Sequence, residues 1–237
     1  MKKLFALLLA VMLVLSMAAC GGSADNTPDQ KDPTNAPTTE ATTEATTEAT
    51  TEATTEATEP QALFSRGTVS GNVYTSDYSG LTFQAPADWV YATDEQIAQT
   101  MNIGMEVLGD DLAFNQAVTK LASVYDTVVN GVDGSSVNIM YENLALTNAL
   151  SYNETDYLNA VKSQLTMLTE ITYQVSDQIT EVELSGQSYY LMSCTTSYSG
   201  VDMVQNYYAR RIGNFMNVVI ITCVGDTTPA AVEACFG

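Results

Sequence analysis

The chain has 237 residues, with 28 acidic side chains, 8 basic side chains and no histidine, and its formal net charge is −20 at pH 7. So acidic a protein repels nucleic acid, whose binding requires Lys and Arg to neutralise phosphates. The lack of histidine excludes the usual Ser-His-Asp and Cys-His catalytic groups and histidine-ligated zinc. We therefore expect no nucleic-acid partner, no metal, no cofactor and no catalytic residue, although carboxylates and tyrosines remain chemically capable of catalysis.

The first 19 residues have the organisation of an export signal. Lys2 and Lys3 precede an apolar run over residues 4–15, which ends at the small residues Ser16, Ala18 and Ala19. A run of this length is too short to span a bilayer as a helix, which takes about 20 residues. Residues 1–19 are thus predicted to be a signal peptide that is removed on export.

Cys20 follows the signal directly and is succeeded by Gly21, Gly22 and Ser23. This stretch resembles a bacterial lipoprotein lipobox, with Met17 where that family usually has Leu. The resemblance implies cleavage between Ala19 and Cys20, diacylglyceryl modification of the Cys20 thiol, and anchoring at the extracytoplasmic face of the cell membrane. Two acyl chains suffice for stable anchoring. The alternative is cleavage by a general signal peptidase, with Cys20 incidental.

Residues 20–60 form a linker of low complexity. Thr-Thr-Glu-Ala occurs five times over residues 38–57. A helix would place the glutamates at i, i+4, where like charges repel, and half of its residues would be Thr. The linker is therefore predicted to be disordered, and its hydroxyls are candidate glycosylation sites.

Residues 61–237 show the alternating and helical periodicities of a folded α+β domain with an antiparallel sheet. A capping box at residues 93–96 opens a helical face formed by Ile97, Met101, Met105 and Leu108. Further helices are predicted at residues 111–121, at 154–169 and after Thr228-Pro229. Strands are predicted at residues 72–74, 81–83, 124–129, 136–142, 172–184, 188–198, 203–212 and 215–224.

The segments Gly71-Asn72-Val73-Tyr74 and Tyr78-Ser79-Gly80-Leu81-Thr82-Phe83-Gln84-Ala85-Pro86-Ala87-Asp88-Trp89 resemble the opening of PsbP-like domains in lipoproteins of Gram-positive anaerobes. The likeness covers residues 68–237, with Asp88 where relatives often have Gly. It implies an α/β/α sandwich, in which helices pack against an antiparallel sheet. It also implies an assembly or accessory role, with no catalytic residue to carry over.

Three cysteines, Cys194, Cys223 and Cys235, remain after Cys20 is assigned to the lipid. Cys194 and Cys223 lie on predicted late strands, so a disulfide between them is one prediction. The other is that both are buried free thiols. Cys235 is expected either to form a disulfide with one of these two cysteines or to remain a free thiol.

Tyrosines gather in the late strands at Tyr189-Tyr190, Tyr198 and Tyr207-Tyr208, beside Arg210-Arg211. Because side chains alternate along a strand, one of each adjacent pair lies on either face of the sheet. The candidate binding surface consists of Tyr190, Tyr198, Tyr208 and Arg210. The competing interpretation places half of the tyrosines in the core and pairs the arginines with carboxylates.

Two acidic clusters have a calcium-binding and a structural interpretation. Asp110-Asp111 is either a ligand or acid/base pair, or the start of a helix, where carboxylates suit the positive end of the dipole. Residues 130–134 contain Asp133 but lack the alternating ligands of an EF-hand, which favours a hairpin turn.

The leading hypothesis is a lipid-anchored surface protein with a non-catalytic domain that binds a protein or a cell-envelope glycan. The alternative is a small-ligand binding protein or an envelope enzyme that uses carboxylates and Tyr, which predicts a pocket with converging Asp, Glu or Arg side chains. An accessory factor without a ligand is a third interpretation.

Overall fold

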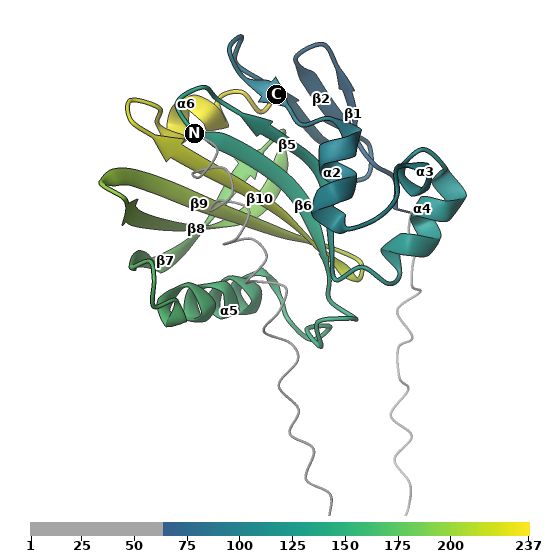
Figure 1. Cartoon of the computed structure of the whole chain (residues 1–237). Coiled ribbons are helices and arrows are strands. Elements are labelled where there is room, and N and C mark those ends of the chain that lie inside the picture. Colours follow the sequence, from purple (N-terminus) through teal and green to yellow (C-terminus); the bar gives the residue numbers. More distant parts are fainter. Residues whose placement is uncertain (1–63) are drawn as a thin grey trace, which may run out of the picture. The chain divides into compact units, whose positions relative to one another are not determined.

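The computed structural model describes residues 64–237, whose centre is a sheet of seven antiparallel strands (Figure 1). From one edge to the other, the strands are β4 (Val90–Tyr91), β5 (Ser123–Asn130), β6 (Ser136–Asn143), β10 (Phe215–Val224), β9 (Val201–Ile212), β8 (Gln187–Tyr198) and β7 (Tyr173–Leu184). The prediction of an α+β protein built on an antiparallel sheet is confirmed. The predicted signal peptide, the predicted lipid anchor at Cys20 and the predicted linker fall outside the described residues.

The long strands occur where the alternation of apolar residues predicts them, because tight turns fix their ends. Ser185 and Gly186 join β7 to β8, with φ of 50° and 69°, and Ser199 and Gly200 join β8 to β9, with φ of 52° and 79°. Two consecutive residues with positive φ form the turn whose twist matches a β-hairpin. The same topology continues through β9 and β10, so the last four strands form a meander.

Four helices cover one face of this sheet: α2 (Asp94–Met101), α3 (Met105–Leu108), α4 (Asp111–Val118) and α5 (Glu154–Met167). The predicted capping box is present, since the Thr93 side chain accepts from the backbone of Gln96 and the Gln96 side chain accepts from that of Thr93. The single helical face expected through Met105 is wrong. The chain leaves the helix at Asn102, which has φ of 55°, and Gly104 then starts α3.

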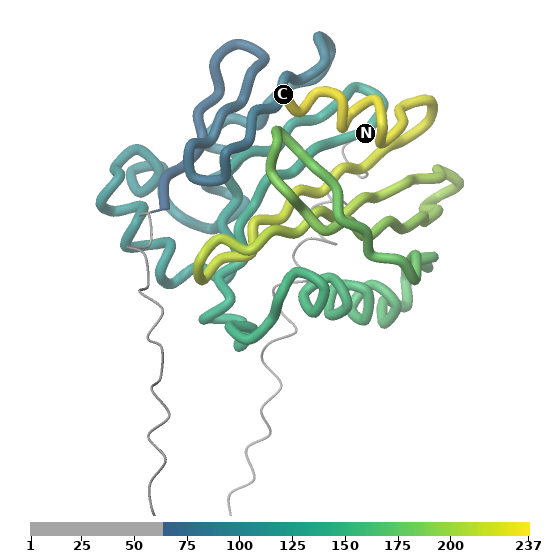
Figure 2. Tube along the Cα trace, turned by 180° about the vertical axis from the view of Figure 1, so that it is seen from behind, coloured from purple at the N-terminus to yellow at the C-terminus, as the bar shows by residue number. Residues whose placement is uncertain are grey.

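A second, smaller sheet lies on the opposite face of the seven-stranded sheet, as the reverse view shows (Figure 2). Its strands are β1 (Thr68–Ser70), β2 (Val73–Ser76) and β3 (Leu81–Gln84), and the terminal helix α6 (Pro229–Glu233) lies on the same side. The chain end pairs with β3, because the Gln84 N–H donates to the Cys235 carbonyl at 2.9 Å. The strands β1 and β4 were not predicted, and both are short and largely exposed.

The two faces carry separate apolar clusters, so the domain has three layers. The helix-side cluster includes Ile97, Phe114, Leu158 and Leu165, while the small-sheet cluster includes Tyr74, Leu81, Phe83, Val219 and Val232. No helix within the described residues has the length and apolar character needed to cross a bilayer.

Candidate functional site

The four residues of the predicted binding surface do not share a face of the sheet. Tyr190 lies directly opposite Ala209 on β9, so Tyr208, the neighbour of Ala209, points to the other side. Tyr208 is fully buried in the small-sheet cluster and donates to the Glu233 carboxylate of α6. Tyr190 and Tyr198 are half-buried against the helix-side cluster. The prediction of one surface containing all three rings is therefore wrong.

Arg210 belongs to the same side as Tyr208 and has structural partners. Its guanidinium donates to the Ser79 carbonyl at 2.8 Å and lies 5.9 Å from the centre of the Tyr189 ring. Arg211 donates to the Tyr152 carbonyl at 2.9 Å. Both arginines thus link the late strands to loops by donating to backbone carbonyls.

The predicted disulfide between Cys194 and Cys223 is absent, and both thiols are free and buried. Cys194 lies on β8 in the helix-side cluster, and Cys223 lies on β10 in the small-sheet cluster, with β9 between the two strands. Two strand spacings place the Cα atoms about 10 Å apart, beyond the reach of a disulfide. Burial raises the pKa of Cys194 to about 12 and that of Cys223 to about 11, so both remain protonated. Cys235 is also free.

The two acidic clusters have structural roles. Asp110 caps α4 by accepting from the Ala113 N–H at 2.8 Å, and Asp111 occupies the first turn. Asp133 accepts from the Ser135 N–H and hydroxyl and from the Thr227 hydroxyl, all within 2.9 Å. Desolvation opposes these hydrogen bonds, yet they lower the pKa of Asp133. Within residues 64–237, no group of three His, Cys, Asp or Glu side chains is arranged to hold a metal ion.

A pocket of about 850 Å³ lies where the chain enters the domain, between residues 64–69, α2, α4 and β5. Its walls include Phe64, Arg66, Tyr91, Asp94, Phe114 and Asp126. We call it the Arg66 pocket. Its volume is in the range of cavities that bind small molecules, and a guanidinium and carboxylates converge on it.

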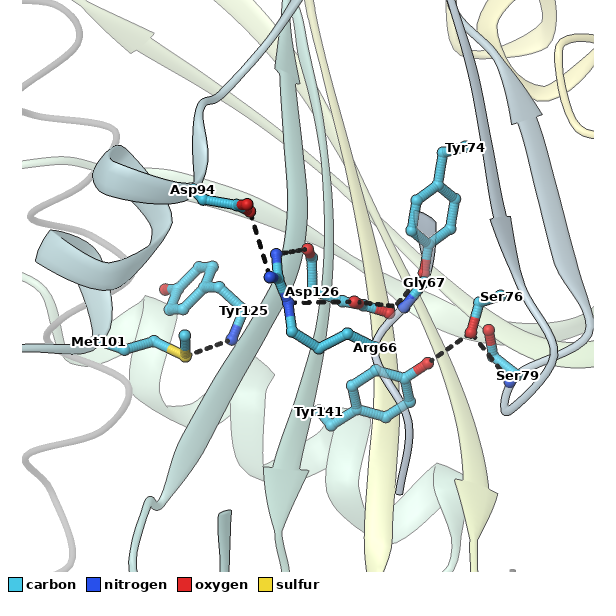
Figure 3. Close-up of polar contacts among 10 residues, drawn as sticks. All are labelled: Arg66, Gly67, Tyr74, Ser76, Ser79, Asp94, Met101, Tyr125, Asp126 and Tyr141. Atoms are coloured by element: carbon cyan, nitrogen blue, oxygen red, sulfur yellow. Dashed lines mark hydrogen bonds and ion pairs between the residues drawn. The ribbon is translucent and has the colours of Figure 1, made fainter. Parts of the chain in front are cut away.

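Asp126 is placed at this pocket by an irregularity in β5. The register with β6 shifts between Tyr125 and Thr127, which leaves Asp126 without a partner residue. Such a bulge redirects a side chain at a sheet edge. The Asp126 side chain has no exposed area, and it accepts from the Gly67 N–H at 2.8 Å and from the Tyr74 hydroxyl at 2.5 Å (Figure 3).

Gly67 can approach Asp126 only because it lacks a side chain. A Cβ atom there would lie 2.3 Å from the Tyr74 ring and 2.7 Å from the Thr75 carbonyl oxygen. The strand β2 therefore holds residues 66 and 67 against β5, which fixes the position of the preceding arginine.

Arg66 spans the pocket from Asp126 on β5 to Asp94 on α2 (Figure 3). Nη1 donates to Asp94 Oδ1 at 3.1 Å, and Nη2 donates to the Asp126 carbonyl at 3.2 Å. Nε lies 4.0 Å from Asp126 Oδ1 and, in the described part of the chain, is a buried nitrogen without a hydrogen-bond partner. The guanidinium is also 5.9 Å from the centre of the Phe114 ring.

Desolvation is the main influence on ionisation here. It raises the pKa of Asp126, while the hydrogen bonds from Tyr74 and Gly67 and the charge of Arg66 act in the opposite direction. Desolvation and the Asp126 charge also raise the pKa of Tyr74 well above its ordinary value. Tyr74 therefore remains a protonated donor to Asp126.

Sequence reasoning did not single out Arg66, Asp94 or Asp126 as a site. One signal was present, because Asp126 is the only charged residue in the apolar run 124–129 that forms a strand. A charge in such a run is buried with a partner or sits at an irregularity. Nothing in the sequence pairs it with Arg66, which lies 60 residues earlier.

Comparison with known proteins adds no assignment, since neither a family model nor a curated protein matches the chain.

Proposed function

We propose that the chain is a lipoprotein of a Gram-positive bacterium, held at the extracytoplasmic face of the cell membrane by a lipid on Cys20. The support is the order of its N-terminal features: two lysines, a short apolar run, small residues and then Cys20, before a Gly-Gly-Ser opening. The proposed membrane partner is thus the bilayer itself, reached through acyl chains.

Metabolic labelling with a palmitate analogue tests the anchor. The wild-type protein should carry the label and remain with membranes, whereas Cys20→Ala should lose the label and leave the membrane fraction. Cys235→Ala is the matched control, because Cys235 is the least buried of the three cysteines in the described residues, and it should keep the label. Unlabelled wild-type protein released into the medium would contradict the anchor.

We further propose that the domain is PsbP-like. The arrangement in favour is a central antiparallel sheet with four helices on one face, while α6 lies on the other face beside the small sheet of β1, β2 and β3. The opening hairpin formed by β2 and β3 coincides with the motif over residues 71–89 that carries the resemblance. An experimental structure in which the helices do not cover the sheet in this order would remove the support.

The function that the site supports best is non-catalytic binding of a small ligand in the Arg66 pocket. The observation that carries this proposal is the placement of a half-buried arginine and a fully buried aspartate in the wall of a pocket of about 850 Å³. Burying charges is costly unless they serve a specific arrangement. The macromolecular partner considered from the sequence would use one surface of tyrosines, and these tyrosines lie on two faces of the sheet.

Native mass spectrometry of the full-length chain after incubation with a cell-envelope extract tests this function. Asn115→Trp on α4 places a large ring in the pocket, where Asn115 is part of the wall. We expect it to abolish retention of a small molecule by the protein. Gln116→Trp, the exposed neighbour on the same helix, should retain it. Retention of the same molecule by both variants would place binding elsewhere.

A further inference from the structure

We propose that the Arg66 pocket selects organic cations: amines with an apolar or aromatic body. This inference deepens the proposed function and rests on it, because it names the class of small ligand that the pocket takes. The charges, the wall residues and the volume of the pocket each favour an organic cation, as follows from the contacts of its residues.

The pocket has an excess of negative charge. Three carboxylates, from Asp94, Asp111 and Asp126, are in its walls together with one guanidinium, that of Arg66. The domain around it is also acidic, since residues 61–237 contain 19 acids and five cations, a net charge of −14. A cleft lined by one sign of charge raises the local concentration of ligands with the opposite sign.

The Arg66 guanidinium is already engaged with acceptors of the protein. One N–H of each terminal nitrogen donates, to Asp94 and to the Asp126 carbonyl, and Nε is buried beside the Asp126 carboxylate. The hydrogen-bond acceptors that remain free are carboxylate oxygens of the pocket wall. Within residues 64–237, Asp94 Oδ2 and the Asp111 carboxylate have no hydrogen-bond donor, and both side chains are exposed to the pocket opening.

Aromatic and aliphatic side chains complete the walls and suit the body of an organic cation. Phe64, Tyr91 and Phe114 contribute rings, and Ile97 and Leu108 contribute aliphatic surface. Aromatic faces attract cations through their quadrupole. The Phe114 ring already has the Arg66 guanidinium 5.9 Å from its centre, so this wall is compatible with positive charge.

The volume and the ligand set favour an organic cation over a metal ion. A pocket of about 850 Å³ is far larger than one hydrated ion needs. In the part of the chain that the structure describes, no three candidate ligands converge as a metal requires. An ammonium group on an apolar body matches both the free carboxylates and the rings.

Three probes that share one ring and differ in charge test the inference: 2-phenylethylamine, 2-phenylethanol and phenylacetate. Binding to the full-length chain would be measured by titration, and its position by NMR shifts of Ala92 and Thr127, which line the pocket. The amine should bind at least about tenfold more tightly than the alcohol, and the acid should be weakest. Raising the salt concentration should weaken the amine alone.

Matched variants separate a local charge from the overall charge. Asp94→Asn and Asp111→Asn should each lower amine affinity about three- to tenfold. Asp77→Asn, which removes the same charge from the exposed turn between β2 and β3, should leave the affinity unchanged. Equal losses in all three variants would overturn the inference.

The remaining outcomes distinguish this inference from the proposed function. The alcohol or the acid could shift the NMR signals of Ala92 and Thr127 and bind with an affinity equal to that of the amine. The pocket would then bind ligands, but the cation inference would be overturned. If no probe shifts these NMR signals, the cation inference is overturned as well. The proposed function is then decided separately, by whether Asn115→Trp abolishes retention of the native ligand.

Discussion

The carboxylate of Asp126 is enclosed by three parts of the chain that are distant in sequence. Gly67 and Tyr74 donate to its two oxygens, and Arg66 contributes the nearest positive charge, 4.0 Å away. Asp126→Asn keeps the shape, removes the charge and places an NH₂ group opposite a donor. We expect it to lower the free energy of unfolding by about 3 kcal/mol, because a donor buried at Asp126 loses its acceptor and the half-buried Arg66 loses one of its two carboxylate partners. Urea denaturation measures the change.

Asp94→Asn is the matched control for this prediction, since Asp94 pairs with the same arginine but its side chain is 62% exposed. Exposed ion pairs contribute about 0 to 1 kcal/mol, so the control should change the stability by no more than that. Equal losses from the two variants would show that burial of Asp126 does not determine its contribution.

Glu142 on β6 provides a test by pH. Desolvation raises the pKa of its carboxyl, while the hydrogen bond from the Tyr157 hydroxyl at 2.6 Å acts in the opposite direction. A raised pKa means that the folded state binds the proton more tightly than the unfolded state. The resulting stability is present below the unfolded pKa, about 4.3, and is lost as the pH rises through the folded pKa.

Glu142→Gln should therefore become more stable relative to the wild type as the pH is raised from about 4 towards neutrality. Denaturation curves at several pH values measure this difference. Tyr157→Phe removes the hydrogen bond that lowers the pKa, so it should extend the fall in stability to higher pH. Parallel pH profiles for the wild type and Glu142→Gln would contradict the assignment.

Single residues were the hardest features to predict from the sequence. The apolar run 124–129 identifies a strand, but the bulge at Asp126 depends on Gly67 and Tyr74, which reach it through tertiary contacts. The capping residue Asp110 was predictable because a cap acts within three residues. Local hydrogen bonds can thus be read from sequence, whereas partners of a buried charge cannot.

At the scale of elements, the turn between β7 and β8 joins the two sheets. The Ser185 hydroxyl accepts from the Thr82 N–H at 3.0 Å and donates to the Thr82 carbonyl at 2.9 Å. Ser185→Ala removes the hydroxyl and leaves the N–H and the carbonyl of Thr82 without this hydrogen-bond partner. We expect a loss of about 1 to 2 kcal/mol in the free energy of unfolding, measured by chemical denaturation.

Ser199 offers a closely matched control. It occupies the equivalent position before Gly200 in the next hairpin, with φ of 52° against 50° for Ser185, and it is exposed. Ser199→Ala should change the stability by less than about 0.5 kcal/mol. If the two variants are equally destabilised, the effect belongs to alanine at a positive φ and not to the contact with β3.

Elements with regular patterns and turn signals were predicted well, and short ones were not. The four strands of the late meander are runs of 10 to 12 residues separated by turn dipeptides. In contrast, β1 and β4 have three and two residues, too few to show a period. The break after Met101 was signalled by Gly104, but the apolar spacing of Met105 and Leu108 continued the helical pattern across it.

At the scale of the whole molecule, alternation predicts that adjacent tyrosines diverge but not which rings meet. The register sets Tyr190 opposite Ala209, and this single pairing sends Tyr190 and Tyr208 to different layers. Cys194 and Cys223 are separated by the strand order, because β9 lies between β8 and β10. Register follows from turn geometry and core packing together, whereas strand order alone keeps Cys194 and Cys223 apart.

The acidity of the domain makes its stability depend on salt. Three ion pairs occupy only Asp94, Asp126 and Asp177 among the described acids, so most of the 19 acids of residues 61–237 lack such a pair. Their mutual repulsion is screened when the Debye length falls from about 30 Å at 0.01 M salt to about 8 Å at 0.15 M. We expect the melting temperature to rise by a few degrees over this range, which corresponds to a gain of about 1 to 2 kcal/mol in the free energy of unfolding.

A triple variant of exposed acids, Glu170→Gln, Glu183→Gln and Asp202→Asn, is the control. It should start with a higher melting temperature and gain less from salt. A melting temperature that falls with salt would mean that attractive pairs outweigh repulsion.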